Sequence, residues 1–112
     1  MPVQTPVAAT ARTEVMMEDR YDAVFAAAGW KRIGTYTVTR SIPFCSRNQV
    51  RLLQYEGPYK GRNHICHIDI PMAHRLYEKR FTNALEKQNL KNMEPYGLTM
   101  DPEVNSVLRM CL

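Results

Sequence analysis

The chain has 112 residues and a mass of 13.0 kDa, with 45% hydrophobic and 23% charged residues. We expect one globular domain, because a chain of this length and composition is too short for two separate hydrophobic cores. It contains no run of about 18 apolar residues and no secretory signal pattern. We therefore expect neither a membrane-spanning helix nor a membrane partner.

The basic charge is concentrated in the middle of the chain. The whole sequence carries a net charge of +4, and residues 31–70 hold seven Lys and Arg against two acidic residues. Residues 1–30 are net acidic, and residues 71–112 are close to neutral. A local positive field attracts acidic partners and speeds their association. We therefore expect the middle third to meet an acidic partner.

The three cysteines, Cys45, Cys66 and Cys111, indicate the redox state of the compartment in which the protein works. An odd number of cysteines with no CxxC pair does not make a disulfide framework. Free thiols are typical of reducing compartments. We expect the protein in the cytoplasm or another reducing intracellular compartment.

The first 28 residues divide into an arm and a helix. Residues 1–12 are rich in Pro, Ala, Thr and Val and contain no acid, which predicts a flexible arm or an arm that orders against a partner. Residues 13–28 predict the first helix, because Thr13 suits an N-cap and apolar residues recur at helical spacing before Gly29. Residues 13–112 are expected to form one domain behind the arm.

Three strands are predicted in the middle third, over residues 35–42, 49–56 and 64–70. Apolar and β-branched residues recur there with the alternation of a strand. Residues 57–63 (GPYKGRN) contain two glycines and a proline, which predicts a loop. Consecutive strands with short links favour an antiparallel meander.

Two further helices are predicted after the strands. Residues 72–90 carry an apolar stripe at helical spacing, and Pro71 suits the first position of that helix. Residues 94–97 (EPYG) predict a turn, and Asp101 followed by Pro102 predicts the start of a short last helix with its own apolar stripe. The expected fold is α+β: a small three-stranded antiparallel sheet with helices on one face, in the order α-β-β-β-α-α.

One stretch contains the side chains that come closest to a metal or catalytic site: His64, Cys66, His67, Asp69 and His74. On one strand, the first two of these point to the face opposite His67 and Asp69, so four zinc ligands cannot converge. Motifs for a phosphate loop, a zinc protease or a serine nucleophile are missing. We expect no catalytic residue, no metal, no cofactor and no small-molecule substrate.

Basic and aromatic residues alternate in and just before the middle third. They are Trp30, Lys31, Arg32, Tyr36, Arg40, Phe44, Arg47, Arg51, Tyr55, Tyr59, Lys60 and Arg62. On a sheet, such a set suits single-stranded nucleic acid, because cations bind phosphates and rings stack on bases. The same residue types are also typical of strand packing and of protein interfaces.

The sequence favours a non-enzymatic, basic structural subunit or adaptor that docks on an acidic protein surface within a larger assembly. Besides the arm, the predicted partner-binding residues are Arg40, Arg47, Arg51, Tyr59, Lys60 and Arg62. The alternative is a nucleic-acid-binding module that uses a basic, aromatic-rich sheet face.

Overall fold

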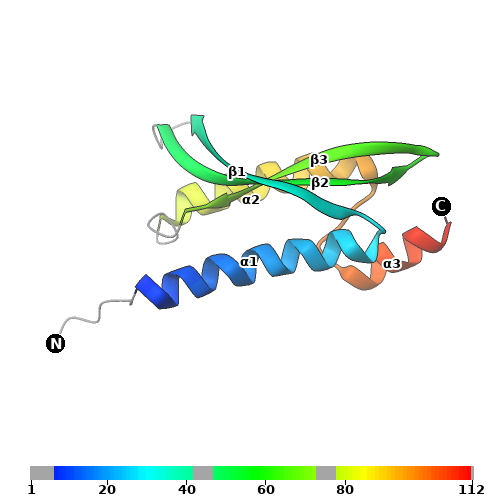
Figure 1. Cartoon of the computed structure of the whole chain (residues 1–112), viewed down its shortest axis with the longest axis horizontal. Coiled ribbons are helices and arrows are strands. Elements are labelled where there is room, and N and C mark those ends of the chain that lie inside the picture. Colours follow the sequence, from blue (N-terminus) through cyan, green and yellow to red (C-terminus); the bar gives the residue numbers. More distant parts are fainter. Residues whose placement is uncertain (1–6, 42–46, 73–77, 112) are drawn as a thin grey trace.

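A computed structural model describes residues 7–41, 47–72 and 78–111 of the chain. Within them, a three-stranded antiparallel sheet combines with three α-helices and a short 3-10 helix (Figure 1). The elements in chain order are α1 (Val7–Ala27), β1 (Lys31–Ser41), β2 (Arg47–Tyr59), β3 (Arg62–Pro71), α2 (Lys79–Met93), η2 (Glu94–Tyr96) and α3 (Pro102–Cys111). The predicted α+β class and the order α-β-β-β-α-α are confirmed.

The first helix is longer than the sequence pattern predicts. α1 begins at Val7, so residues 7–12, predicted as part of the arm, are helical. This segment contains alanine and arginine, which are good helix formers, and it has no proline after Pro6. Residues 1–6 lie outside the described part of the chain.

The strands are also longer than predicted. β1 begins at Lys31, and its register with β2 shifts between Arg32 and Gly34, which marks a bulge at Ile33. A bulge lets a strand bend while it stays paired on both sides. The alternation of polar and apolar residues that predicts a strand is interrupted at a bulge, because the extra residue moves the following side chains to the other face of the sheet.

The β2–β3 hairpin closes with a two-residue turn. Lys60 and Gly61 both have a positive φ, 50° and 76°, as in a type I′ turn. Strand pairing continues on both sides up to this turn. The predicted loop over residues 57–63 is therefore wrong, because Gly57 and Pro58 still belong to β2.

The second helix starts later than predicted. Pro71 ends β3 and pairs with Val50, so it does not open a helix. α2 begins at Lys79 and continues to Met93. Residues 73–77, which include the candidate ligand His74, lie outside the described part of the chain.

The main core lies between α1 and one face of the sheet (Figure 1). Phe25 of α1 stacks on Tyr55 of β2 with the ring centroids 3.9 Å apart, and Trp30 meets Phe25 edge-on at 5.7 Å. Burial of such large rings supplies much of the stability of a small domain. The buried members of this core are Tyr21, Val24, Phe25, Ala28, Trp30, Leu53, Tyr55, Cys66, Ile68, Ile70, Met93 and Leu98.

A smaller apolar cluster fixes the first half of α2. Phe81 and Leu85 are buried against Val50, and Val38 packs on the same group. Val50 is an odd number of residues from Leu53 on the same strand, so it points to the opposite face of β2. The start of α2 therefore contacts the sheet face that α1 does not cover.

α2 and η2 cover the outer edge of β3. The Asn89 carboxamide accepts a hydrogen bond from the N–H of Asp69 and donates one to its carbonyl, both at 2.8 Å. Along the same strand edge, Asn92 donates to the carbonyl of His67 at 3.1 Å, and Tyr96 donates to the carbonyl of Ile65 at 3.3 Å. Edge strands otherwise expose unpaired backbone groups, so these side chains take the place of a fourth strand.

α3 packs against α1 through a polar anchor. Asp101 caps α3 as predicted, since its carboxylate accepts a hydrogen bond from the N–H of Glu103 at 3.0 Å. Asn105 is fully buried and donates to the carbonyl of Val24 at 2.8 Å. The predicted apolar stripe of this helix is not its buried face, because Val104 and Val107 are exposed.

Candidate functional site at the end of the hairpin

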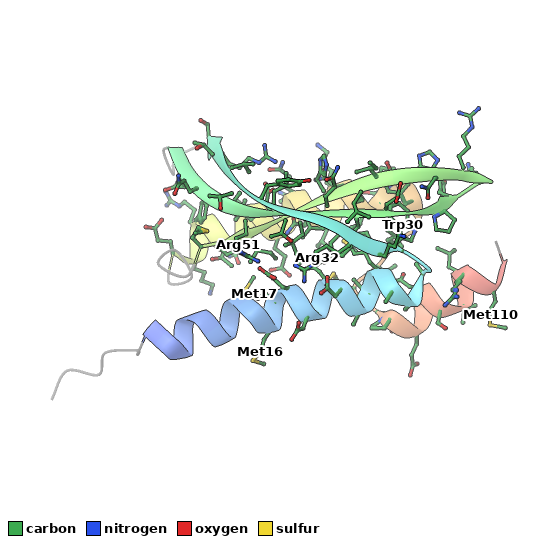
Figure 2. The ribbon with its side chains drawn as sticks, in the orientation of Figure 1. Met16, Met17, Trp30, Arg32, Arg51 and Met110 are labelled. Atoms are coloured by element: carbon green, nitrogen blue, oxygen red, sulfur yellow. The ribbon has the colours of Figure 1, made fainter. Side chains whose placement is uncertain are left out.

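Two arginines of the basic middle third are used inside the fold. Arg32 donates to Glu18 and to Asp22 of α1, both at 2.9 Å, and Arg51 pairs with Glu18. The Tyr55 hydroxyl donates to Asp22 at 2.5 Å. Figure 2 shows Arg32 and Arg51 between the sheet and α1. The acidic first third of the chain therefore neutralises part of the basic middle third.

The ionisation of these groups follows from their contacts. Burial raises the pKa of Glu18, but hydrogen bonds from Arg51 and Arg32 outweigh burial and lower it below its ordinary value of 4.5. Burial and the contact with Asp22 raise the pKa of the Tyr55 hydroxyl. Glu18 is thus a carboxylate, and Tyr55 a neutral donor, at neutral pH.

Arg40, another predicted partner-binding residue, is tied to the sheet. Its guanidinium donates to both carboxylate oxygens of Asp69, at 2.9 Å and 3.4 Å. The Asp69 side chain is only 4% exposed, so removal of Arg40 would leave a carboxylate without its cation in a nearly dry place. Arg47 opens β2 opposite Ser41, and its side chain lies outside the described part of the chain.

Three of the predicted residues come together at the end of the β2–β3 hairpin. Lys60 and Arg62 are exposed, and Tyr59 is half-buried beside them. The Lys60 Nζ lies 5.3 Å from the centroid of the Tyr59 ring, within the range of a cation–π contact. Among the residues that the structure describes, no carboxylate forms an ion pair with Lys60 or Arg62.

His64 and Tyr96 complete this group. The Tyr96 ring lies 5.5 Å from that of Tyr59 and 5.4 Å from that of His64, and the Trp30 ring lies 5.1 Å from it. We call Tyr59, Lys60, Arg62, His64 and Tyr96 the hairpin-end surface. Sequence reasoning missed Tyr96, because η2 reaches the hairpin only after α2 has run along β3.

A shallow groove adjoins the hairpin-end surface at Tyr96. It runs between β3 and the end of α2, with a volume of about 440 Å³. Lys91 and His67, both exposed, stand on its sides and add basic groups next to the surface. The groove is lined by Ile65, Cys66, His67, Lys91, Asn92, Pro95 and Tyr96.

Cys66 lies in the lining of this groove and is buried in the core. Cys66 is 2% exposed, and its thiol lies 3.6 Å from the carbonyl oxygen of Asn92. Burial raises its pKa to about 12, so the reactive thiolate is scarce at neutral pH. Within the described residues, no group of three His, Cys, Asp or Glu side chains could hold a metal ion.

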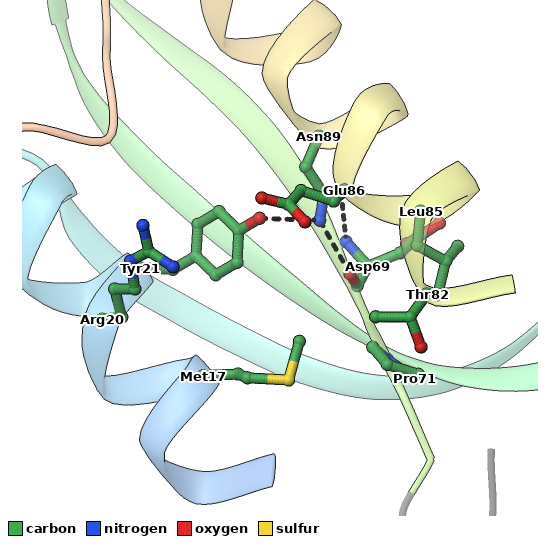
Figure 3. A pocket seen from close by; sticks show the side chains of 9 residues that line it. All are labelled: Met17, Arg20, Tyr21, Asp69, Pro71, Thr82, Leu85, Glu86 and Asn89. Carbon is green, nitrogen blue, oxygen red and sulfur yellow. Dashed lines mark hydrogen bonds between the residues drawn. The ribbon is translucent and has the colours of Figure 1, made fainter. Parts of the chain in front are cut away.

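A second hollow lies between α1 and α2. It has a volume of about 50 Å³, and Tyr21, Asn89 and the backbone of Asp69 bond to each other in its wall (Figure 3). The buried hydroxyl oxygen of Thr82 lies in the same wall and has no hydrogen-bond partner among the described residues. Asn89 donates to the Tyr21 hydroxyl at 3.2 Å while it holds the backbone of Asp69. Binding sites for small molecules are several times larger, so this hollow holds at most a few waters.

Comparison with protein-family models, curated proteins and solved structures gives no match. None of the helices that the structure describes has the length and apolarity needed to cross a membrane. What the hairpin-end surface does is therefore inferred from its own residues.

Proposed function

We propose that this protein is a non-enzymatic interaction subunit whose hairpin-end surface docks on an acidic protein surface within a larger assembly. One observation carries the proposal: Lys60 and Arg62 have no acidic partner in the described part of the chain and stand beside the half-buried rings of Tyr59 and Tyr96. Tyrosine and arginine are enriched where proteins bind each other, because a rigid ring and a fixed cation lose little entropy on binding.

The surface is smaller than the one the sequence pattern predicted. Arg40 and Arg51 pair with Asp69 and Glu18, so their charges are already balanced inside the fold. An acidic partner would have to compete with the carboxylates of Asp69 and Glu18 for these two arginines. Arg62 and Lys60 are therefore the cations that we assign to the partner, with Lys91 in the adjoining groove as a third.

An acidic protein fits this surface better than a single-stranded nucleic acid. Tyr59 and Tyr96 meet at 85° and Tyr59 and His64 at 71°, so these rings pack edge to face. A base-stacking platform needs open ring faces and a continuous line of cations along the strand.

We further propose that the protein works in a reducing compartment, in line with the odd cysteine count and the free Cys66.

The test removes charge at the hairpin end and, separately, at a distant site. In the test variant, Lys60→Asn with Arg62→Glu keeps a turn that Asn-Gly favours. The matched control, Lys79→Gln with Arg80→Glu, changes the charge equally at two exposed positions of α2. Each protein is used to recover partners from a lysate of the source cells, with and without nuclease, and bound proteins are quantified by mass spectrometry.

We expect a defined acidic protein to remain bound after nuclease treatment. The amount of it that is recovered should fall about tenfold with the hairpin variant and not with the control variant. Equal recovery with the hairpin variant contradicts the assigned surface. Bound material that disappears with nuclease supports the nucleic-acid-binding alternative. In that case, affinity for an oligonucleotide should fall steeply with salt, because each neutralised phosphate releases counterions.

A further inference from the structure

The two edges of the sheet differ in how their backbone groups are used. The outer edge of β3 is bonded by Asn89, Asn92 and Tyr96. β1 is the other edge strand, and it pairs only with β2 in the part of the chain that the structure describes. An open edge strand is a template for a further strand.

β1 carries few of the features that keep an edge strand from pairing. From Ile33 to Thr39 it has no charged residue and no proline, and three of its residues are β-branched threonines. Tyr36 is 52% exposed and Ile33 is 42% exposed. Edge strands that remain single are usually protected by lysine, proline or inward charges. The bulge at Ile33 protects only the first part of this strand.

The side chains of β1 are complementary to a second copy of the same strand. About Thr37, an antiparallel copy places Thr37 opposite Thr37, Thr35 opposite Thr39, and Tyr36 opposite Val38. Paired threonines, and an aromatic ring opposite a β-branched residue, are favourable cross-strand pairs. A twofold axis at Thr37 produces all of them at once, because the segment TYTVT is nearly symmetric about its centre.

We propose that two copies of this protein pair through β1 in antiparallel fashion, with the twofold axis at Thr37, to form one six-stranded sheet. Charge agrees with this register, since the only charged residue among positions 33–41 is Arg40, which meets Gly34 of the second copy. Arg40 already holds Asp69 of its own chain, so no like charges come together. The interface is isologous and closed.

Two features of the fold permit this pairing. Figure 1 shows that β1 starts beside the C-terminal end of α1 and diverges from that helix along its length. The covered edge of β3 ends the sheet on each side. Assembly therefore stops at two copies and does not continue into a fibre.

The first test is the mass of the full chain in solution, measured by sedimentation equilibrium over a range of concentrations. We expect twice the monomer mass of 13.0 kDa. Thr37→Lys brings two ammonium groups together on the axis and raises the dissociation constant at least about tenfold. Thr37→Val should keep the strand and leave the dissociation constant of the dimer unchanged. Asn83→Lys adds the same charge on the exposed face of α2 and should also leave the dimer unchanged.

The second test reads the register directly. In a background with Cys45→Ser and Cys111→Ser, Thr37→Cys is oxidised under mild conditions and analysed without reductant. Cysteines at directly opposed positions are about 5 Å apart at Cα and form a disulfide. Thr39→Cys is the control, because its two copies lie about 14 Å apart at Cα in this register.

Dimer mass together with a crosslink at position 37 alone supports the proposal. A wild-type monomer at every concentration overturns it, as does a dimer that Thr37→Lys leaves intact. A crosslink at position 39 and not at 37 moves the axis and contradicts the register. None of these outcomes depends on Lys60 or Arg62, so the proposed partner surface is tested separately.

Discussion

The indole of Trp30 fills the space in which Gly57 would carry a side chain. A Cβ at Gly57 would lie 2.1 Å from Cγ of Trp30, which is far closer than two carbon atoms can approach. Trp30 is 4% exposed and packs edge-on against Phe25, so the ring has no free direction in which to move. The contact joins the end of α1 to the hairpin that carries the proposed partner surface.

Gly57→Ala should therefore destabilise the fold. We expect a loss of about 2 to 3 kcal/mol in the free energy of unfolding, the range of an overpacked core. Gly34→Ala is the matched control, compared at a concentration at which the chain is monomeric, because in the single chain the atoms near its Cβ belong to the exposed Tyr36 side chain, which can rotate away. The measurement is urea denaturation at one protein concentration. Equal losses in the two variants would contradict the role of the Trp30 contact.

Asn89 holds the edge of β3, and its removal should be costly. Asn89→Ala leaves the N–H and the carbonyl of Asp69 without partners next to α2. Each of the two buried backbone groups left unpaired costs about 1 to 3 kcal/mol, so we expect a total loss of about 2 to 6 kcal/mol. Hydrogen exchange of the Asp69 amide should also become faster than in the wild type.

Asn83→Ala serves as the control for this variant, because Asn83 is exposed on the same helix. Alanine is the better helix former, so this control should be neutral or slightly stabilising. A small effect of Asn89→Ala, with unchanged exchange at Asp69, would falsify the role of Asn89 as a substitute for a fourth strand.

The Glu18 network should make part of the stability depend on pH. The pKa of Glu18 is lowered in the folded state, because the hydrogen bonds from Arg51 and Arg32 outweigh burial. Its contribution is then present above the ordinary value of 4.5 and is lost as the pH falls through the lower, folded value. Glu18→Gln should cost about 1 to 2 kcal/mol at pH 7 and much less at pH 3.

The free energy of unfolding is measured between pH 3 and pH 7 for the wild type, Glu18→Gln and Asp19→Asn. Asp19 is an exposed neighbour on α1, so the last variant removes the same charge outside the network. The difference between the wild-type and Glu18→Gln free energies of unfolding should shrink as the pH falls. A constant difference would mean that Glu18 titrates as it does in the unfolded chain.

Cys66 should resist alkylation in the folded protein. Burial raises the pKa of its thiol to about 12 and keeps reagents away from the sulfur. At pH 8, we expect the peptide that contains Cys66 to react with iodoacetamide at least about a hundredfold more slowly than in 6 M urea, because reaction needs opening of the core. Mass spectrometry of that peptide measures both rates. Similar rates would place Cys66 outside the core.

Several elements could be predicted because their causes are local. Asp101 and Pro102 mark the start of α3, since capping needs only the residues on either side of the helix end. Gly29, two residues after the end of α1, lies in the left-handed region, as expected of a helix stop. The element order also followed from short-range patterns of polar and apolar residues.

Two of the errors arise because pairing and packing override the local pattern. The stretch 57–63 contains turn-forming residues, but pairing across a tight turn keeps all except Lys60 and Gly61 in the strands. The apolar stripe of α3 suggested a buried face, whereas the buried Asn105 anchors that helix to the carbonyl of Val24. Neither outcome depends on neighbours in the sequence alone.

The sequence by itself determined the helices and strands, their order and the excess of positive charge in the middle third. Tertiary structure alone decided which of these charges remain available, because α1 brings Glu18 to Arg51 and β3 brings Asp69 to Arg40. It also decided that Tyr96 joins the hairpin, that side chains of α2 and η2 cover β3, and that β1 pairs only with β2 among the described residues. The physical reason is that pairing, burial and edge coverage depend on distances in space, which a pattern along the chain does not contain.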